Sequence, residues 1–161
     1  MTVEDLLVCK KQILKKRKPI FQIDQRHQKM NIELKCDYNL KMTMFLRRLI
    51  ERPEDFSIGL RIDTPNPFAD YTLVLVRFQG PHGGQSLEKD INNLHNDYHI
   101  HVYSEDDFKF RRKMASYKEK GDFNSFEEAL LKFLEYCNIE DTYNIFDDER
   151  QRVMQFEMCL N

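Results

Sequence analysis

Hydrophobic and polar residues alternate through much of the first half of the chain. From Met30 to Leu46 every second residue is apolar, and most of the residues between them are polar. Because successive side chains of a β-strand point to opposite faces, a period of two predicts strands with one buried face. The run is too long for one average strand. A turn at Asp37-Tyr38-Asn39 would divide it, so we expect a β-hairpin here.

Other segments predict further strands. Residues 20–23 favour a short strand, and Phe56 to Ile62 alternates again. Tyr71 to Phe78 is apolar on both faces, which is typical of a central strand covered on both sides. The stretch Asn92 to Tyr103 reads N-N-L-H-N-D-Y-H-I-H-V-Y and contains the last predicted strand.

Three segments predict helices. Thr2 and Asp5 have the spacing of a capping box, and the helix that they begin would end at Pro19. Ser125 to Cys137 has a capping residue followed by apolar residues at helical spacing, and 147–158 predicts a last helix. Strands followed by helices indicate an α+β fold. We expect one domain, 1–161, with a mostly antiparallel sheet of five or six strands, an N-terminal helix and two C-terminal helices.

Composition fits a globular protein away from membranes. The 161 residues are 41% hydrophobic and 32% charged. No apolar run approaches the ~20 residues that span a bilayer, and the N-terminus lacks the order of a signal peptide. The four cysteines are scattered among apolar neighbours, which favours buried free thiols. These features predict a cytoplasmic protein with no membrane partner.

Charge is distributed unevenly. Residues 1–60 hold 13 Lys and Arg against 8 Asp and Glu, whereas residues 104–161 hold 9 against 14. A basic N-terminal half is a candidate contact for RNA or DNA. The residues that would bind such a partner are Lys10, Lys11, Lys15, Lys16, Arg17, Lys18, Arg47, Arg48 and Arg77. A solvated face or a helix C-terminus would explain part of the same pattern without a partner.

Four of the five histidines, His82, His95, His99 and His101, lie within twenty residues. His99 and His101 share one face of the predicted strand. One interpretation is a metal site in which His95, Asp97 or His82 adds a third ligand, although spacing fixes none of them.

A second interpretation is metal-free acid–base cleavage of RNA by His99 and His101. In a third, the two histidines serve structure or recognition. The sequence alone assigns no metal ligand and no cofactor.

One set of motifs resembles a known family. The segments V-R-F-Q-G-P-H and H-N-D-Y-H-I-H-V-Y, followed by a capped helix and Y-C-N-I, are similar to small uncharacterised proteins of bacteria and prophages. In that family a strand ending in G-P-H precedes an H-[IL]-H-[IVL]-Y strand. The likeness covers about residues 56–140, and Asp97-Tyr98 departs from the family's Pro or Asn. It implies a mobile-element protein but no activity.

The combined prediction is a non-enzymatic interaction protein of prophage type, which binds and inhibits or regulates a host protein or nucleoprotein. The alternative is a histidine-dependent ribonuclease with His99 and His101 as its catalytic residues. A metal-binding enzyme is the third hypothesis.

Overall fold

The computed structural model describes residues 1–14, 20–63, 69–82, 94–140, 145–148 and 150. The helices in these ranges are α1 (Val3–Val8), α2 (Glu105–Lys109) and α3 (Phe126–Tyr136), with a 3-10 turn η1 (Leu94–Asn96). The strands are β1 (Lys11–Ile13), β2 (Gln22–Asp24), β3 (His27–Cys36), β4 (Lys41–Leu49), β5 (Phe56–Ile62), β6 (Leu73–Gln79), β7 (His99–Val102), β8 (Tyr117–Lys120) and β9 (Ile139–Glu140).

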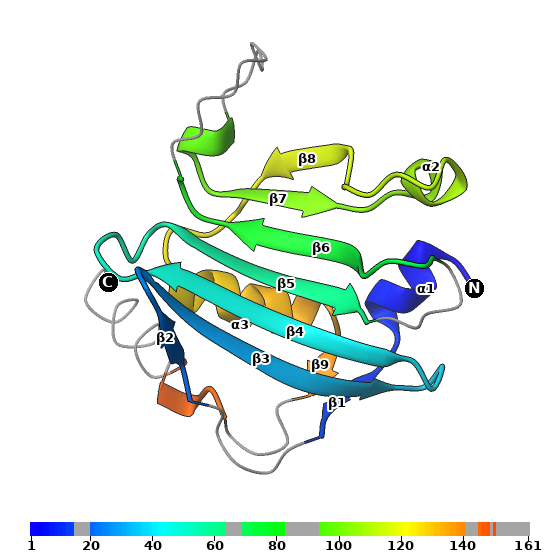
Figure 1. Ribbon diagram of the computed structural model, residues 1–161, viewed down its shortest axis with the longest axis horizontal. Helices are drawn as coiled ribbons and strands as arrows, with labels where there is room; N and C mark the ends of the chain where they lie inside the picture. Colours follow the sequence, from blue (N-terminus) through cyan, green and yellow to red (C-terminus); the bar gives the residue numbers. More distant parts are fainter. Residues whose placement is uncertain (15–19, 64–68, 83–93, 141–144, 149, 151–161) are drawn as a thin grey trace.

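A single large sheet forms the body of the protein (Figure 1). Eight of the nine strands in the described part of the chain lie in the order β8-β7-β6-β5-β4-β3-β1-β9. The ninth strand, β2, lies off this path and pairs with β3. The β3–β4 hairpin predicted from the alternation is present, with Asn39 in the left-handed region at its turn. All pairs run antiparallel except β1 and β9, which are parallel.

Helix α3 covers one face of this sheet (Figure 1). The Ser125 hydroxyl accepts the backbone N–H of Glu128, and the Glu128 carboxylate accepts the backbone N–H of Asn124. Phe78 of β6 packs edge-on against Phe133 of α3, with ring centroids 5.3 Å apart. The apolar residues of β3 to β6 that face α3 form the core together with apolar residues of α1 and α3, and burial of this apolar surface is the main stabilising term.

The predicted α+β fold, with a mostly antiparallel sheet of five or six strands, an N-terminal helix and two C-terminal helices, is wrong. The sheet is larger than five or six strands and is mixed, and the helices of the described residues are short. The N-terminal helix ends at Val8 instead of Pro19, because Lys11–Ile13 pairs with β3 and β9 as β1. Strands β1, β8 and β9 were not predicted, because strands of two to four residues carry little periodicity. Most of the predicted helix 147–158 lies outside the described residues.

No helix in the described ranges combines the length and apolar character needed to cross a membrane.

Candidate metal centre

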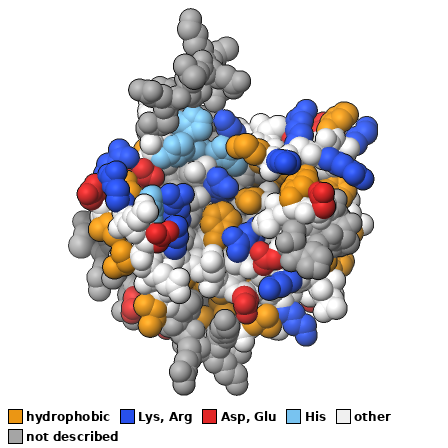
Figure 2. Space-filling view, in the orientation of Figure 1, with side chains coloured by type: hydrophobic (Ala, Val, Ile, Leu, Met, Phe, Trp, Pro, Cys, Tyr) orange, Lys and Arg blue, Asp and Glu red, His pale blue; other side chains and the backbone are white. Residues whose placement is uncertain are grey.

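The sheet face opposite α3 carries the histidine pair of β7. Ile100 pairs with Phe78, which packs against α3, so its neighbours His99 and His101 point to the other face. Strand register places Gln79 and Lys120 on either side of His99. This surface is called the open face below. Figure 2 shows it, with histidine side chains gathered in one place and lysines and arginines around them.

Two further histidines reach the same place from the segments on either side of residues 83–93. His82 follows β6, and His95 belongs to η1, just before β7. The backbone N–H of His82 donates to the carbonyl oxygen of His95 at 3.0 Å, which ties the two segments together. The ring centroids of His82 and His95 then lie 5.2 Å and 5.4 Å from that of His99. The antiparallel β6–β7 pairing therefore converts a sequence cluster into a spatial one.

His82, His95 and His99 have the geometry of a metal-binding group. Each offers a ring nitrogen, and these three atoms lie within 4.8 Å of one another. His82 Nε2 and His95 Nδ1 are 3.1 Å apart. Ligand nitrogens at about 2.0–2.1 Å from a tetrahedral zinc ion lie roughly 3.3 Å from each other. The distance between His82 and His95 is already close to that spacing. The longer nitrogen–nitrogen distances in the group, up to 4.8 Å, would shorten if the side chains moved inward.

The hydrogen bonding of His99 prepares it to act as a ligand. Its Nδ1 lies 2.8 Å from the carbonyl oxygen of Asp97, and a carbonyl only accepts, so Nδ1 carries the proton. Nε2 then presents a lone pair, and this atom is buried with no hydrogen-bond partner among the described residues. A backbone carbonyl that fixes the tautomer is a usual companion of a metal-ligating imidazole.

Electrostatics favours the neutral form of His82 and His99. Burial lowers the pKa of His99. The hydrogen bond with the Asp97 carbonyl opposes this effect, and the nearby His82, His95 and Lys118 add to it. Burial, with His95 as the next cause, also lowers the pKa of His82. The neutral form is the one that binds a metal ion.

His101 lies beside the three-histidine group without belonging to it. Its ring centroid is 5.0 Å from that of His99, and its Nε2 is also buried with no partner in the described part of the protein. Burial, followed by the effect of His99, lowers the pKa of His101 to about 3. His101 therefore stays neutral at physiological pH.

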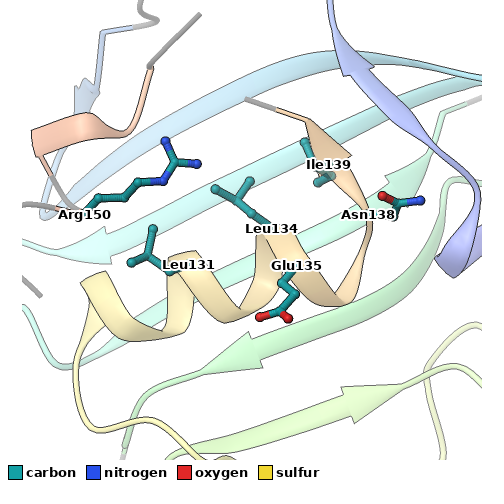
Figure 3. A pocket seen from close by; sticks show the side chains of 6 residues that line it. All are labelled: Leu131, Leu134, Glu135, Asn138, Ile139 and Arg150. Atoms are coloured by element: carbon teal, nitrogen blue, oxygen red, sulfur yellow. The ribbon is translucent and has the colours of Figure 1, made fainter. Parts of the chain in front are cut away.

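A polar cavity of about 380 Å³ adjoins the histidine group on the open face. His82 lines it together with Arg47, Ser57 and Arg77. A second hollow of about 520 Å³ lies along α3, on the other side of the sheet (Figure 3). Leucine and isoleucine side chains form much of its wall, and it contains none of the histidines. The open face is therefore the better candidate for chemistry.

The structure separates the cations that the sequence grouped together. Arg47 and Arg77 lie on the open face, whereas Arg48 lies on the α3 side, where its guanidinium is 5.0 Å from the ring centroid of Phe126. Lys10 pairs with Glu140 at 2.7 Å.

Lys11 is completely buried, and its ammonium donates to the carbonyl oxygens of Leu7, Cys9 and Cys137, each at 2.8 Å. Lys11 therefore cannot contact a partner. Lys15, Lys16, Arg17 and Lys18 lie outside the described residues.

Comparisons with protein-family models, with curated proteins and with solved structures find no match. The resemblance to prophage proteins therefore stays a prediction.

Proposed function

We propose that the protein binds a divalent transition-metal ion through His82, His95 and His99 and uses it as a hydrolytic centre. The observation that carries the proposal is the convergence of three imidazole nitrogens within 4.8 Å, one of them the buried and unpartnered Nε2 of His99. A buried polar atom without a partner costs free energy, and a bound ion removes that cost.

The donor set indicates the kind of metal. Imidazole nitrogen suits zinc, copper and nickel, whereas magnesium and calcium prefer oxygen ligands. Three protein ligands leave a fourth tetrahedral position for water, as in catalytic zinc sites. When bound, such an ion supplies a water molecule of lowered pKa as a nucleophile.

The remaining groups position and shield this site. The Asp97 carbonyl fixes the ring of His99, and the backbone hydrogen bond from His82 to His95 holds their two segments together. His101, half-buried beside His99 and neutral, brings no positive charge that would repel a cation.

Calorimetric titration with Zn²⁺ tests the proposal. We expect one ion per chain, and affinity reduced by ~100-fold or more in His95→Gln, because each ligand contributes to the whole coordination energy. His27→Gln is the matched control, since His27 lies near Arg47 and outside the three-histidine group. His95 is only half-buried, so its replacement leaves the core intact, and circular dichroism checks the fold. Equal binding by wild type and His95→Gln would contradict the proposal.

Metal-free cleavage of RNA by His99 and His101, the sequence-based alternative, has less support. His99 is completely buried, and burial lowers the pKa of both imidazoles. A chelator separates the two mechanisms, because only the metal-free one survives complete removal of divalent ions.

The binding of a host protein or nucleoprotein remains a second proposal, supported by the cations of the open face. A pull-down from host lysate, with and without nuclease treatment, tests it. A partner that is retained after nuclease treatment would be a protein, and a partner lost with it would point to nucleic acid.

A further inference from the structure

Arg77 is a partly buried cation without a described counter-ion. It lies at the middle of β6, where register places it between Gly59 and His101 on the open face. No carboxylate of the described residues lies within ion-pair distance of its guanidinium. Burial lowers the pKa of Arg77, and the neighbouring Arg47 lowers it further, which marks a local excess of positive charge. A partly desolvated cation beside another cation is costly unless an anion joins them.

The sequence of β4 and β5 holds Arg77 in place. Gly59 has no side chain, and a Cβ at that position would lie 2.2 Å from Cζ of Phe45. The Phe45 ring therefore lies directly over Gly59, with the guanidinium of Arg77 at 5.7 Å from its centroid and that of Arg61 at 5.9 Å. The two arginines differ in one respect: Arg61 pairs with Asp63 at 2.9 Å. Arg77 is thus fixed by a ring and remains available to an external anion.

The cavity next to Arg77 has the donors that an oxyanion needs. Arg47 and Arg77 both line it, and Ser57 contributes a hydroxyl that is buried without a described partner. Gln79 adds an amide. The cavity also contains one carboxylate, Asp55, whose charge is met by Arg52 at 3.0 Å. Planar guanidinium groups bind phosphate through two parallel N–H bonds, so this donor set suits a phosphoryl group.

We propose that this cavity, called the Arg77 cavity below, binds the phosphoryl group of a phosphate-ester substrate of the metal centre. The inference rests on the proposed function, because His82 is shared by the cavity and the three-histidine group. A phosphoryl group held by Arg77 and Arg47 would lie beside His82, and a metal ion held by His82, His95 and His99 would supply the activated water.

The reaction that follows is a redox-neutral hydrolysis. The water oxygen forms a new bond to phosphorus, and the bond between phosphorus and the ester oxygen breaks. The departing alkoxide takes a proton that derives from the attacking water. No co-reactant other than water is required.

Phosphate binding without metal tests the Arg77 cavity separately from the metal centre. Inorganic phosphate is titrated into the protein in the presence of a chelator, and amide chemical shifts are followed by NMR. We expect saturable shifts around Ser57 and Arg77, and affinity reduced at least tenfold in Arg77→Gln. Arg61→Gln is the matched control, since Arg61 contacts the same ring but is paired with Asp63; its affinity should stay within about twofold. Equal losses in the two variants, or no saturable binding by wild type, would overturn the inference.

Two further arms separate the hypotheses and the sources of the phosphoryl group. His95→Gln should lose zinc and keep phosphate binding in chelator. If the wild-type protein binds zinc but not phosphate, the Arg77 cavity is contradicted and the metal centre is not. If it binds phosphate but not zinc, only the proposed function is contradicted. A nucleoside monophosphate and a single-stranded oligonucleotide show whether the natural ester is small or polymeric. Arg77→Gln must weaken the binding of both ligands. If the variant binds the oligonucleotide as tightly as wild type does, the Arg77 cavity is not the site that binds the oligonucleotide.

Discussion

His82 Nε2 and His95 Nδ1 lie 3.1 Å apart, although thirteen positions separate the two residues along the chain. The β6–β7 pairing brings their backbones together, and a backbone hydrogen bond between them closes the arrangement. His99 then lies against both rings. The antiparallel pairing of β6 and β7 thereby creates a nitrogen-rich group that no contiguous motif contains.

Replacement of Lys11 should be among the most damaging changes in the protein. Lys11→Met leaves the carbonyl oxygens of Leu7, Cys9 and Cys137 without their donor, so we expect a loss of about 3–5 kcal/mol in the free energy of unfolding. Urea denaturation measures it. Lys10→Met is the control and should cost less than about 1 kcal/mol, because Lys10 pairs with Glu140 at the surface. Similar effects of the two changes would be inconsistent with a buried ammonium.

Gly59 should not accept a side chain while Phe45 keeps its position. Gly59→Ala places a methyl group into the Phe45 ring, and we expect a cost of about 1–3 kcal/mol from the forced displacement. Adding Phe45→Leu to Gly59→Ala should restore part of the lost stability, because leucine is smaller than phenylalanine and leaves room for the methyl group. A double-mutant cycle by urea denaturation measures the coupling. Strictly additive effects would show that the ring does not lie over Gly59.

Asp107 of α2 should stabilise, as a carboxylate, the connection between β7 and β8. Burial alone would raise its pKa, but hydrogen bonds from Ser104 and Ser116 outweigh that effect and hold the pKa well below the usual value. Because the folded-state pKa is the lower one, this stability is present above the unfolded value near pH 4 and is lost as pH falls below it. Asp107→Asn should cost about 2–4 kcal/mol at pH 7. The difference between variant and wild type should shrink at pH 3, and a constant difference would contradict the ionised role.

The histidine cluster should make stability fall on mild acidification. Burial lowers the pKa of His82, His99 and His101, the last to about 3, whereas an unfolded histidine titrates near 6.5. Below about pH 6.5 the unfolded chain binds more protons than the folded chain, so the free energy of unfolding decreases as pH decreases. His101→Gln removes one such group. Its stability should fall less steeply from pH 6.5 to 5, by up to about 1.4 kcal/mol per pH unit. Urea denaturation in chelator measures the slopes, and equal slopes would contradict the lowered pKa of His101.

The elements that sequence reasoning identified correctly are those whose signal is local. The β3–β4 hairpin follows from alternation on both sides of one turn, and α3 follows from Ser125 and an apolar stripe. The missed elements depend on distant residues. Strand β1 is three residues long and pairs with Cys36 and Ile139, which no local pattern around Lys11 reveals. The positive charge of Lys11 suggested a surface, because its three carbonyl acceptors come together only in the folded chain.

The candidate site likewise has parts that the sequence predicts and parts that it does not. His99 and His101 could be placed on one strand face from their spacing alone, and the crowding of four histidines was visible in the sequence. The choice of ligands was not, because His82 and His95 lie outside the strands and reach His99 only through the β6–β7 pairing. The pairing of Arg61 with Asp63, which distinguishes it from Arg77, likewise required the structure.

X-ray absorption at the zinc edge of the zinc-loaded protein tests the central claim most directly. Three imidazole nitrogens at about 2.0–2.1 Å and one oxygen ligand are the predicted coordination. A shell of sulfur at about 2.3 Å, or of oxygen alone, would contradict a metal centre built from His82, His95 and His99.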